Sequence, residues 1–191
     1  MSQFEYLSVL VSIIIGLGLS HLLASAARLI QVRRRVRLYW PTCAQMGALF
    51  LVQIQIWWAA FERRNESNWN FFSFLLYLLI PVLVALLSYL IVPDLDEEQE
   101  VNLRASYYEN RQWFFGLLAA APVISLTEEY VLDYAAGEAI RPDADAVYRV
   151  AFFALALAAA LIRKEAYHFF SAFLLLGLVL AYIFTLFLQL A

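Results

Sequence analysis

Residues 70–92 have the sequence NFFSFLLYLLIPVLVALLSYLIV, which contains 23 residues and no charged side chain. At 1.5 Å rise per residue, a helix of this length extends about 35 Å, which exceeds the ~30 Å hydrocarbon core of a bilayer. Uncharged runs of 18 or more residues are typical of membrane helices. The segment therefore predicts a transmembrane helix.

Five further apolar stretches of similar length predict the same structure across the rest of the chain. Hydrophobic residues make up 64% of the 191 residues, and the mean hydropathy is +0.72. We therefore predict an all-α polytopic membrane protein, with a single membrane domain over 1–191. The six predicted spans run over about 5–30, 42–62, 70–92, 112–134, 146–163 and 167–190.

The distribution of basic residues predicts how the chain is oriented in the membrane. Cytoplasmic loops of membrane proteins are enriched in Lys and Arg. If the N-terminus is outside, nine basic residues fall on the cytoplasmic side and four on the other. The nine are Arg28, Arg33, Arg34, Arg35, Arg37, Arg104, Arg111, Arg163 and Lys164, and the four are Arg63, Arg64, Arg141 and Arg149. We predict a multi-pass protein of a bacterial inner (plasma) membrane with both termini outside.

Two parts of the chain resemble each other at a separation of about 100 residues. AAFERRNESNWNFFSFLL at 59–76 and AALIRKEAYHFFSAFLL at 159–175 share Ala-Ala, a basic pair and Phe-Phe-Ser. Three spans per half is an odd number, so a second copy would enter the membrane upside down. The pattern predicts two inverted three-helix repeats, an architecture common among secondary transporters. The alternative is a chance match among abundant Phe, Leu and Ala residues.

Two adjacent acidic residues and one arginine stand out inside predicted spans, where charge is costly and usually marks function. Glu128 and Glu129 lie in the span over 112–134, and Arg149 lies at a similar depth in the next span. We predict an ion pair between these two helices within the membrane. Two adjacent carboxylates cannot share one arginine equally, so one of them is a candidate for a proton or cation path. The alternative is that the pair only holds the two helices together.

Other polar residues inside the spans suggest an inward route. Gln53 and Gln55 point about 200° apart on a helix, so they cannot face the same partner. One amide is expected to bond to a neighbouring helix and the other to line a cavity. His21 is a candidate proton relay, or a buried hydrogen-bonding residue. The two histidines, His21 and His168, fall at different depths, which argues against haem, and we expect neither a metal site nor a cofactor.

The first span carries small residues at every fourth position. Such a stripe lets a second helix approach closely in lipid. The stripe consists of Ser8, Ser12, Gly16, Ser20 and Ala24. We favour packing against another span of the same chain, which would make this a central helix, over packing against another subunit.

Two spans contain a central proline, Pro81 and Pro122. Proline removes a hydrogen bond from the helix and clashes with the preceding turn, so both helices are predicted to kink. Kinked helices can line a binding site, although most such prolines affect packing only.

The polar residues within the spans favour a small channel or transporter that passes protons or a small cation. Glu128 and Glu129 would titrate, and Arg149 would be their partner and gate. One alternative is a membrane scaffold, sensor or accessory subunit without transport, and another is a membrane-embedded enzyme acting on a lipid or quinone. The sequence has no HExxH, G-x-S-x-G, P-loop or Gly-rich dinucleotide motif, which makes an enzyme the weaker choice. Expected partners are membrane lipid, the transported ion and, in one alternative, further copies of the chain, but not nucleic acid.

Overall fold

The computed structural model describes residues 3–61, 64, 69–93, 100–136 and 144–186. These residues form six helices and a pair of two-residue strands, so the predicted all-α class is confirmed. In chain order the elements are α1 (Gln3–Gln31), β1 (Val36–Arg37), α2 (Trp40–Ala60), α3 (Phe71–Leu90), β2 (Val101–Asn102), α4 (Leu103–Ala136), α5 (Ala144–Leu161) and α6 (Glu165–Leu186).

Within the described residues, four helices are long and apolar enough to cross a membrane, namely α1, α2, α3 and α6. The apolar middle of α4 is flanked by charges, with Arg104 and Arg111 before it and Glu128 after it. In α5, Asp145 and Arg149 occupy the first turns. Four such helices are compatible with an integral membrane protein.

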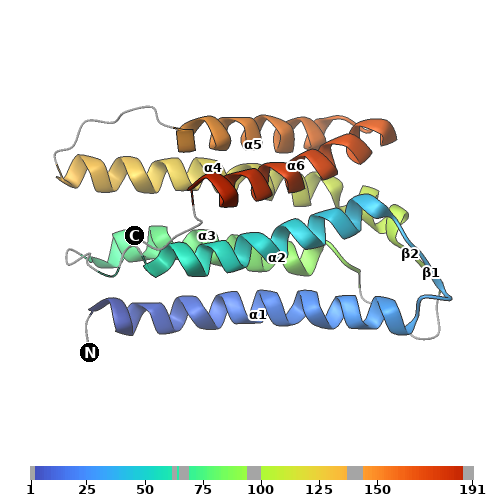
Figure 1. Ribbon diagram of the computed structural model, residues 1–191, viewed down its shortest axis with the longest axis horizontal. Coiled ribbons are helices and arrows are strands. Elements are labelled where there is room, and N and C mark those ends of the chain that lie inside the picture. Colours follow the sequence, from blue (N-terminus) through green and yellow to red (C-terminus); the bar gives the residue numbers. More distant parts are fainter. Residues whose placement is uncertain (1–2, 62–63, 65–68, 94–99, 137–143, 187–191) are drawn as a thin grey trace.

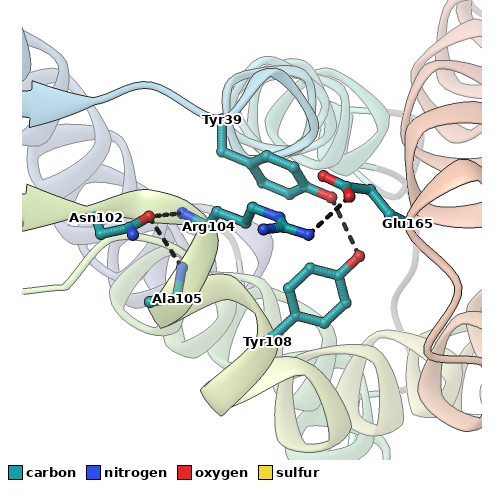
Figure 2. A network of polar contacts seen from close by, with 6 residues as sticks. All are labelled: Tyr39, Asn102, Arg104, Ala105, Tyr108 and Glu165. Atoms are coloured by element: carbon teal, nitrogen blue, oxygen red, sulfur yellow. Dashed lines mark hydrogen bonds and ion pairs between the residues drawn. The ribbon is translucent and has the colours of Figure 1, made fainter.

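Polar residues fix where several helices begin. The side chain of Asn70 caps α3, because its Oδ1 accepts hydrogen bonds from the backbone N–H groups of Phe72 and Ser73, both at 2.9 Å. Asn102 caps α4 in the same way, accepting from Arg104 and Ala105 at 3.1 and 3.3 Å (Figure 2). Such caps satisfy backbone donors that have no partner within the helix.

The helices run along one axis in alternating directions (Figure 1). At one end, β1 and β2 pair in parallel, with Val36 beside Val101 and Arg37 beside Asn102. This pair ties the α1–α2 connection to the α3–α4 connection. We call this end of the bundle the strand end, and the other, where α1 begins and α6 ends, the opposite end (Figure 1).

Five helices form a closed ring, and α1 lies outside it. Around the ring, α2 contacts α3, α3 contacts α4, α4 contacts α5, α5 contacts α6, and α6 contacts α2. The α1 helix packs on α2 and α3 and forms the outermost layer in Figure 1. The expectation that the first span is a central helix is therefore wrong.

The small-residue stripe of α1 faces away from the rest of the chain. Ser12, Gly16, Ser20 and Ala24 are exposed, and a Cβ atom added to Gly16 would meet nothing within 4 Å. Ser8 is half-buried and its hydroxyl donates to the backbone oxygen of Glu5 at 3.0 Å. Packing of this stripe within the chain is thus overturned, while packing against another subunit stays a prediction.

A different face of α1 makes the contact, and Gly18 lies at its centre. A Cβ atom on Gly18 would overlap Oε1 of Gln53 on α2, and would lie 2.9 Å from the Gln53 Cδ and 3.2 Å from the Ala85 Cα on α3. The buried residues of this face are Val11, Ile15, Gly18, Leu22, Ser25 and Leu29. The closest approach of α1 to its neighbours therefore depends on Gly18 rather than on Gly16.

The helix contacts match the proposed repeat only in part. The α1–α2 and α2–α3 contacts have counterparts in α4–α5 and α5–α6. Among the described residues, α1–α3 and α3–α4 have no counterpart of comparable extent in α4–α6 and α6–α1. Residues 62–63 and 65–68 of the first copy lie outside the described part of the chain, and the repeat stays a prediction.

Candidate functional site, a central cavity with a charged end

A cavity of about 390 Å³ lies among the five helices of the ring and is lined by α2, α3, α4, α5 and α6. On α2 the lining extends from Gln45 to Ala60, and fifteen helical residues correspond to roughly 22 Å along the axis. The cavity is thus long and narrow. Its volume falls within the ~300–1,000 Å³ of known small-molecule sites.

Most of the cavity wall is apolar. Residues of the middle section include Leu49, Val52, Ile56, Ile80, Val84, Leu118, Phe152, Leu175 and Val179. The two helix-interior prolines, Pro81 and Pro122, are buried and also line the cavity. A proline nitrogen cannot donate to the carbonyl oxygen one turn earlier. Each proline therefore leaves one backbone oxygen near the cavity without its helical hydrogen bond and able to accept from another donor. The kinks predicted at these residues stay a prediction.

The charged residues of the cavity gather towards the opposite end. Arg149 on α5 forms ion pairs with Glu129 on α4 and with Asp145 one turn earlier on its own helix. The predicted pairing of a span-four glutamate with Arg149 is therefore found. Asp145 was not predicted as a partner, although its position four residues before Arg149 is the spacing at which helical side chains meet.

The adjacent glutamates have different surroundings, because neighbouring residues point about 100° apart on a helix. Glu128 is 6% exposed and lines the cavity. Glu129 keeps 38% of its side chain exposed and binds Arg149. Two carboxylates, Glu129 and Asp145, bind the guanidinium of Arg149, and Glu128 is a third carboxylate at this end of the cavity. When they are ionised, their excess negative charge attracts cations.

The residues predicted to form an inward route lie in two separate places. Gln55 lines the cavity. Gln53 is 1% exposed and lies in the α1–α2–α3 interface, where its Nε2 donates to Ser88 Oγ at 3.0 Å. The ring of His21 on α1 stacks on Tyr89 of α3 with centroids 3.9 Å apart. Gln53 and His21 are therefore outside the cavity lining. Gln53 and Gln55 point about 200° apart on α2, so only one of these two glutamines can face the cavity.

The strand end is closed by a buried network around His168. The Nε2 of His168 lies 2.8 Å from the backbone oxygen of Ile162, and its Nδ1 lies 3.0 Å from the hydroxyl of Tyr107. A carbonyl can only accept, so Nε2 carries the proton and Nδ1 of the neutral ring accepts from Tyr107. Arg111, which is 2% exposed, donates to the backbone oxygens of Ala159 and Ile162 at 3.1 and 2.7 Å. These contacts cap the C-terminal end of α5.

Aromatic rings extend this closure towards the strands. The hydroxyl groups of Tyr39 and Tyr108 are 3.3 Å apart, and Arg104 forms a 2.7 Å ion pair with Glu165 beside them (Figure 2). Burial raises the pKa of Tyr39 above the usual tyrosine range, so its hydroxyl group remains protonated. The cavity lining includes none of these residues.

Several residues of the cavity could not be recognised from the sequence. Tyr77, Tyr148 and Tyr182 lie near the charged residues at the opposite end of the cavity. Gln45 lies at the other end, is 2% exposed, and its Nε2 has no hydrogen-bond partner. In the described part of the chain, no group of three or more His, Cys, Asp or Glu residues could hold a metal ion.

No protein-family model, curated protein or solved structure matches this chain. The chemistry of the cavity is therefore the basis for a functional assignment.

Proposed function

We propose that the protein is a membrane carrier that passes protons or a small cation through the central cavity. The cavity supports this proposal because acidic residues and Arg149 lie at one end of it. At the strand end, the His168 and Arg111 network closes the bundle. A site that is reached from one side at a time is typical of alternating access, in which a carrier opens its two ends in turn.

In this proposal all six helices cross the membrane. The α4 and α5 helices complete the ring with α2, α3 and α6, so they must share the depth of these helices. Arg111 of α4 donates to backbone oxygens inside the protein, and Glu129 of α4 pairs with Arg149 of α5, as lipid surroundings demand. The strand end, which carries the basic residues of the α1–α2 connection, would face the cytoplasm of a bacterium. The inverted repeat would suit such a carrier, although the proposal does not depend on it.

The mechanism follows from the two partners of Arg149. Its pair with Glu129 joins α4 to α5, whereas its pair with Asp145 stays within α5. A proton that neutralises Glu129 removes the link between the helices and leaves the guanidinium held by Asp145. The α4–α5 contact then loosens, and Glu128, which lines the cavity, exchanges its proton or cation with the other side.

Proton flux into liposomes tests this proposal. The purified protein is reconstituted with a pH-sensitive dye inside the vesicles, and a pH or potential gradient is imposed. Glu128→Gln and Glu129→Gln should each lower the flux about a hundredfold or more, because positioned proton-transfer groups contribute about 10²–10⁴-fold. Glu109→Gln is the matched control, because Glu109 is exposed on α4 and does not line the cavity. Equal flux in all four proteins, or no flux in the unmodified protein, would contradict the proposal.

One observation favours a second candidate, a scaffold or accessory subunit. The exposed stripe of α1 offers small residues to a further helix, and no element of the described chain covers it. This candidate predicts disulfide crosslinking between copies of a Gly16→Cys variant in native membranes, together with no proton flux from the purified protein. Crosslinking through the native Cys43 on α2 is the background to be subtracted.

A further inference from the structure

The cavity has more apolar wall than a proton or an inorganic cation needs. Its volume of about 390 Å³ far exceeds the ~30 Å³ that one water molecule occupies in the liquid. Residues such as Leu49, Val84 and Leu175 give nothing to a hydrated ion, whereas they stabilise a hydrocarbon group by removing it from water. The middle of the cavity therefore fits the body of an organic molecule.

The charged end combines a buried carboxylate with aromatic rings. Glu128 lies there with Tyr77, Tyr148 and Tyr182, and the rings of Tyr148 and Tyr182 are edge to face with centroids 5.4 Å apart. Aromatic faces attract alkylated ammonium groups, which are weakly hydrated. Calcium needs six to eight oxygen ligands, and the described residues offer no cluster of that kind. These surroundings favour an ammonium group over a metal cation.

The far end of the cavity offers a hydrogen-bond donor. The Nε2 of Gln45 is buried without a partner and lies in the cavity wall, fifteen residues along α2 from Ala60. An unpaired buried donor costs free energy, which an acceptor on a bound molecule would recover. The apolar section separates this donor from Glu128.

From these three features we propose that the cavity binds an elongated organic cation. Its ammonium group lies between Glu128 and the tyrosines, its alkyl body lies along the apolar wall, and an acceptor oxygen approaches Gln45. This inference rests on the proposed function in one respect, since it names the substrate of the same cavity. Binding can nevertheless be measured without any flux.

A series of head groups on one alkyl chain tests the proposal with the unmodified protein. Hexyltrimethylammonium, 1-hexanol and hexanoate are titrated into the protein in a neutral maltoside detergent, and binding is followed by calorimetry. The ammonium compound should bind saturably, and at least about tenfold more tightly than the other two, as expected for a charge-assisted contact. Equal binding of hexanol, tighter binding of hexanoate through Arg149, or no saturable binding of the ammonium compound would overturn the proposal.

Variants then locate the two ends of the ligand. Glu128→Gln and Tyr182→Leu should each weaken hexyltrimethylammonium at least severalfold, and Glu109→Gln should leave it unchanged. Gln45→Leu should weaken a longer ammonium compound with a terminal carbonyl but not its hydrocarbon analogue. If Glu128→Gln does not fold, Tyr182→Leu and the head-group series still decide. Proton flux without ammonium binding overturns this inference alone, whereas binding without flux overturns only the proposed function.

Discussion

Replacing Gly18 by alanine should destabilise the protein, although alanine is the better helix former. The new Cβ would overlap Oε1 of Gln53 and would lie 3.2 Å from the Ala85 Cα. The Gln53 side chain would have to move and lose its 3.0 Å bond to Ser88, at a cost of about 1 kcal/mol. Forcing a methyl group into a packed interface adds roughly 1–3 kcal/mol. Alanine returns about 1 kcal/mol through helix propensity, so we expect a net loss of about 1–3 kcal/mol.

Gly16→Ala is the matched control, because it makes the same change two residues earlier on the exposed face. It should be neutral or stabilising by up to about 1 kcal/mol. The free energy of unfolding is measured by SDS titration in mixed micelles. Adding Gln53→Ala to Gly18→Ala should recover part of the loss, because the main clash is removed while Ala85 remains close. If Gly18→Ala is as stable as Gly16→Ala, α1 does not pack through the Gly18 face.

Four further substitutions probe the strand end by the same unfolding measurement. Arg111→Met should cost about 2 kcal/mol, because the backbone oxygens of Ala159 and Ile162 lose a charged donor; a neutral result would show that these oxygens find other donors. Tyr107→Phe should cost about 1–2 kcal/mol, because the Nδ1 of buried His168 loses its hydrogen-bond donor. Tyr108→Phe should cost less, because it loses only a 3.3 Å contact with Tyr39. Arg104→Gln should cost less than about 1 kcal/mol, because Arg104 and Glu165 keep 56% and 47% of their side chains exposed and solvent screens their ion pair. A larger loss would mean that solvent screens this pair less than its exposure implies.

Hydropathy predicts most of the helices but not how they extend beyond the apolar core. The third predicted span, 70–92, differs from α3 by one or two residues at each end. In contrast, α4 begins at Leu103, nine residues before the predicted span. Charges such as Arg111 suggested a polar connection, yet its guanidinium caps α5. A single sequence cannot indicate that backbone oxygens 48 and 51 residues away will pair with this charge.

The packing face of α1 shows a second limit of sequence patterns. Small residues at four-residue spacing and apolar residues at mixed spacing are both acceptable against lipid or protein, because lipid tails are as apolar as leucine. Only the position of Gln53 and Ala85 opposite Gly18 distinguishes the faces. The pattern therefore predicted a contact for α1 but assigned it to the wrong side of the helix.

The charged residues of the candidate site could be predicted from the sequence, because charges are rare inside the apolar segments. A carboxylate or guanidinium inside an apolar segment stands out, and Glu129 and Arg149 were recognised as partners in this way. Tyr77 and Tyr182 could not be recognised, because tyrosines are common in this chain and only the ring of helices brings these two together.

Arg111 and Arg149 differ in one property that bears on the proposed mechanism. Arg111 donates to backbone carbonyls, which do not titrate, so its contacts persist across the pH range in which the protein is folded. Arg149 is held by carboxylates, whose protonation removes the attraction. A change in proton concentration therefore acts directly on the α4–α5 link at the opposite end and leaves the Arg111 cap intact. In the proposed mechanism, protons therefore act first at the opposite end, and the strand end opens only afterwards, through the movement of α4 against α5 that the loss of this link allows.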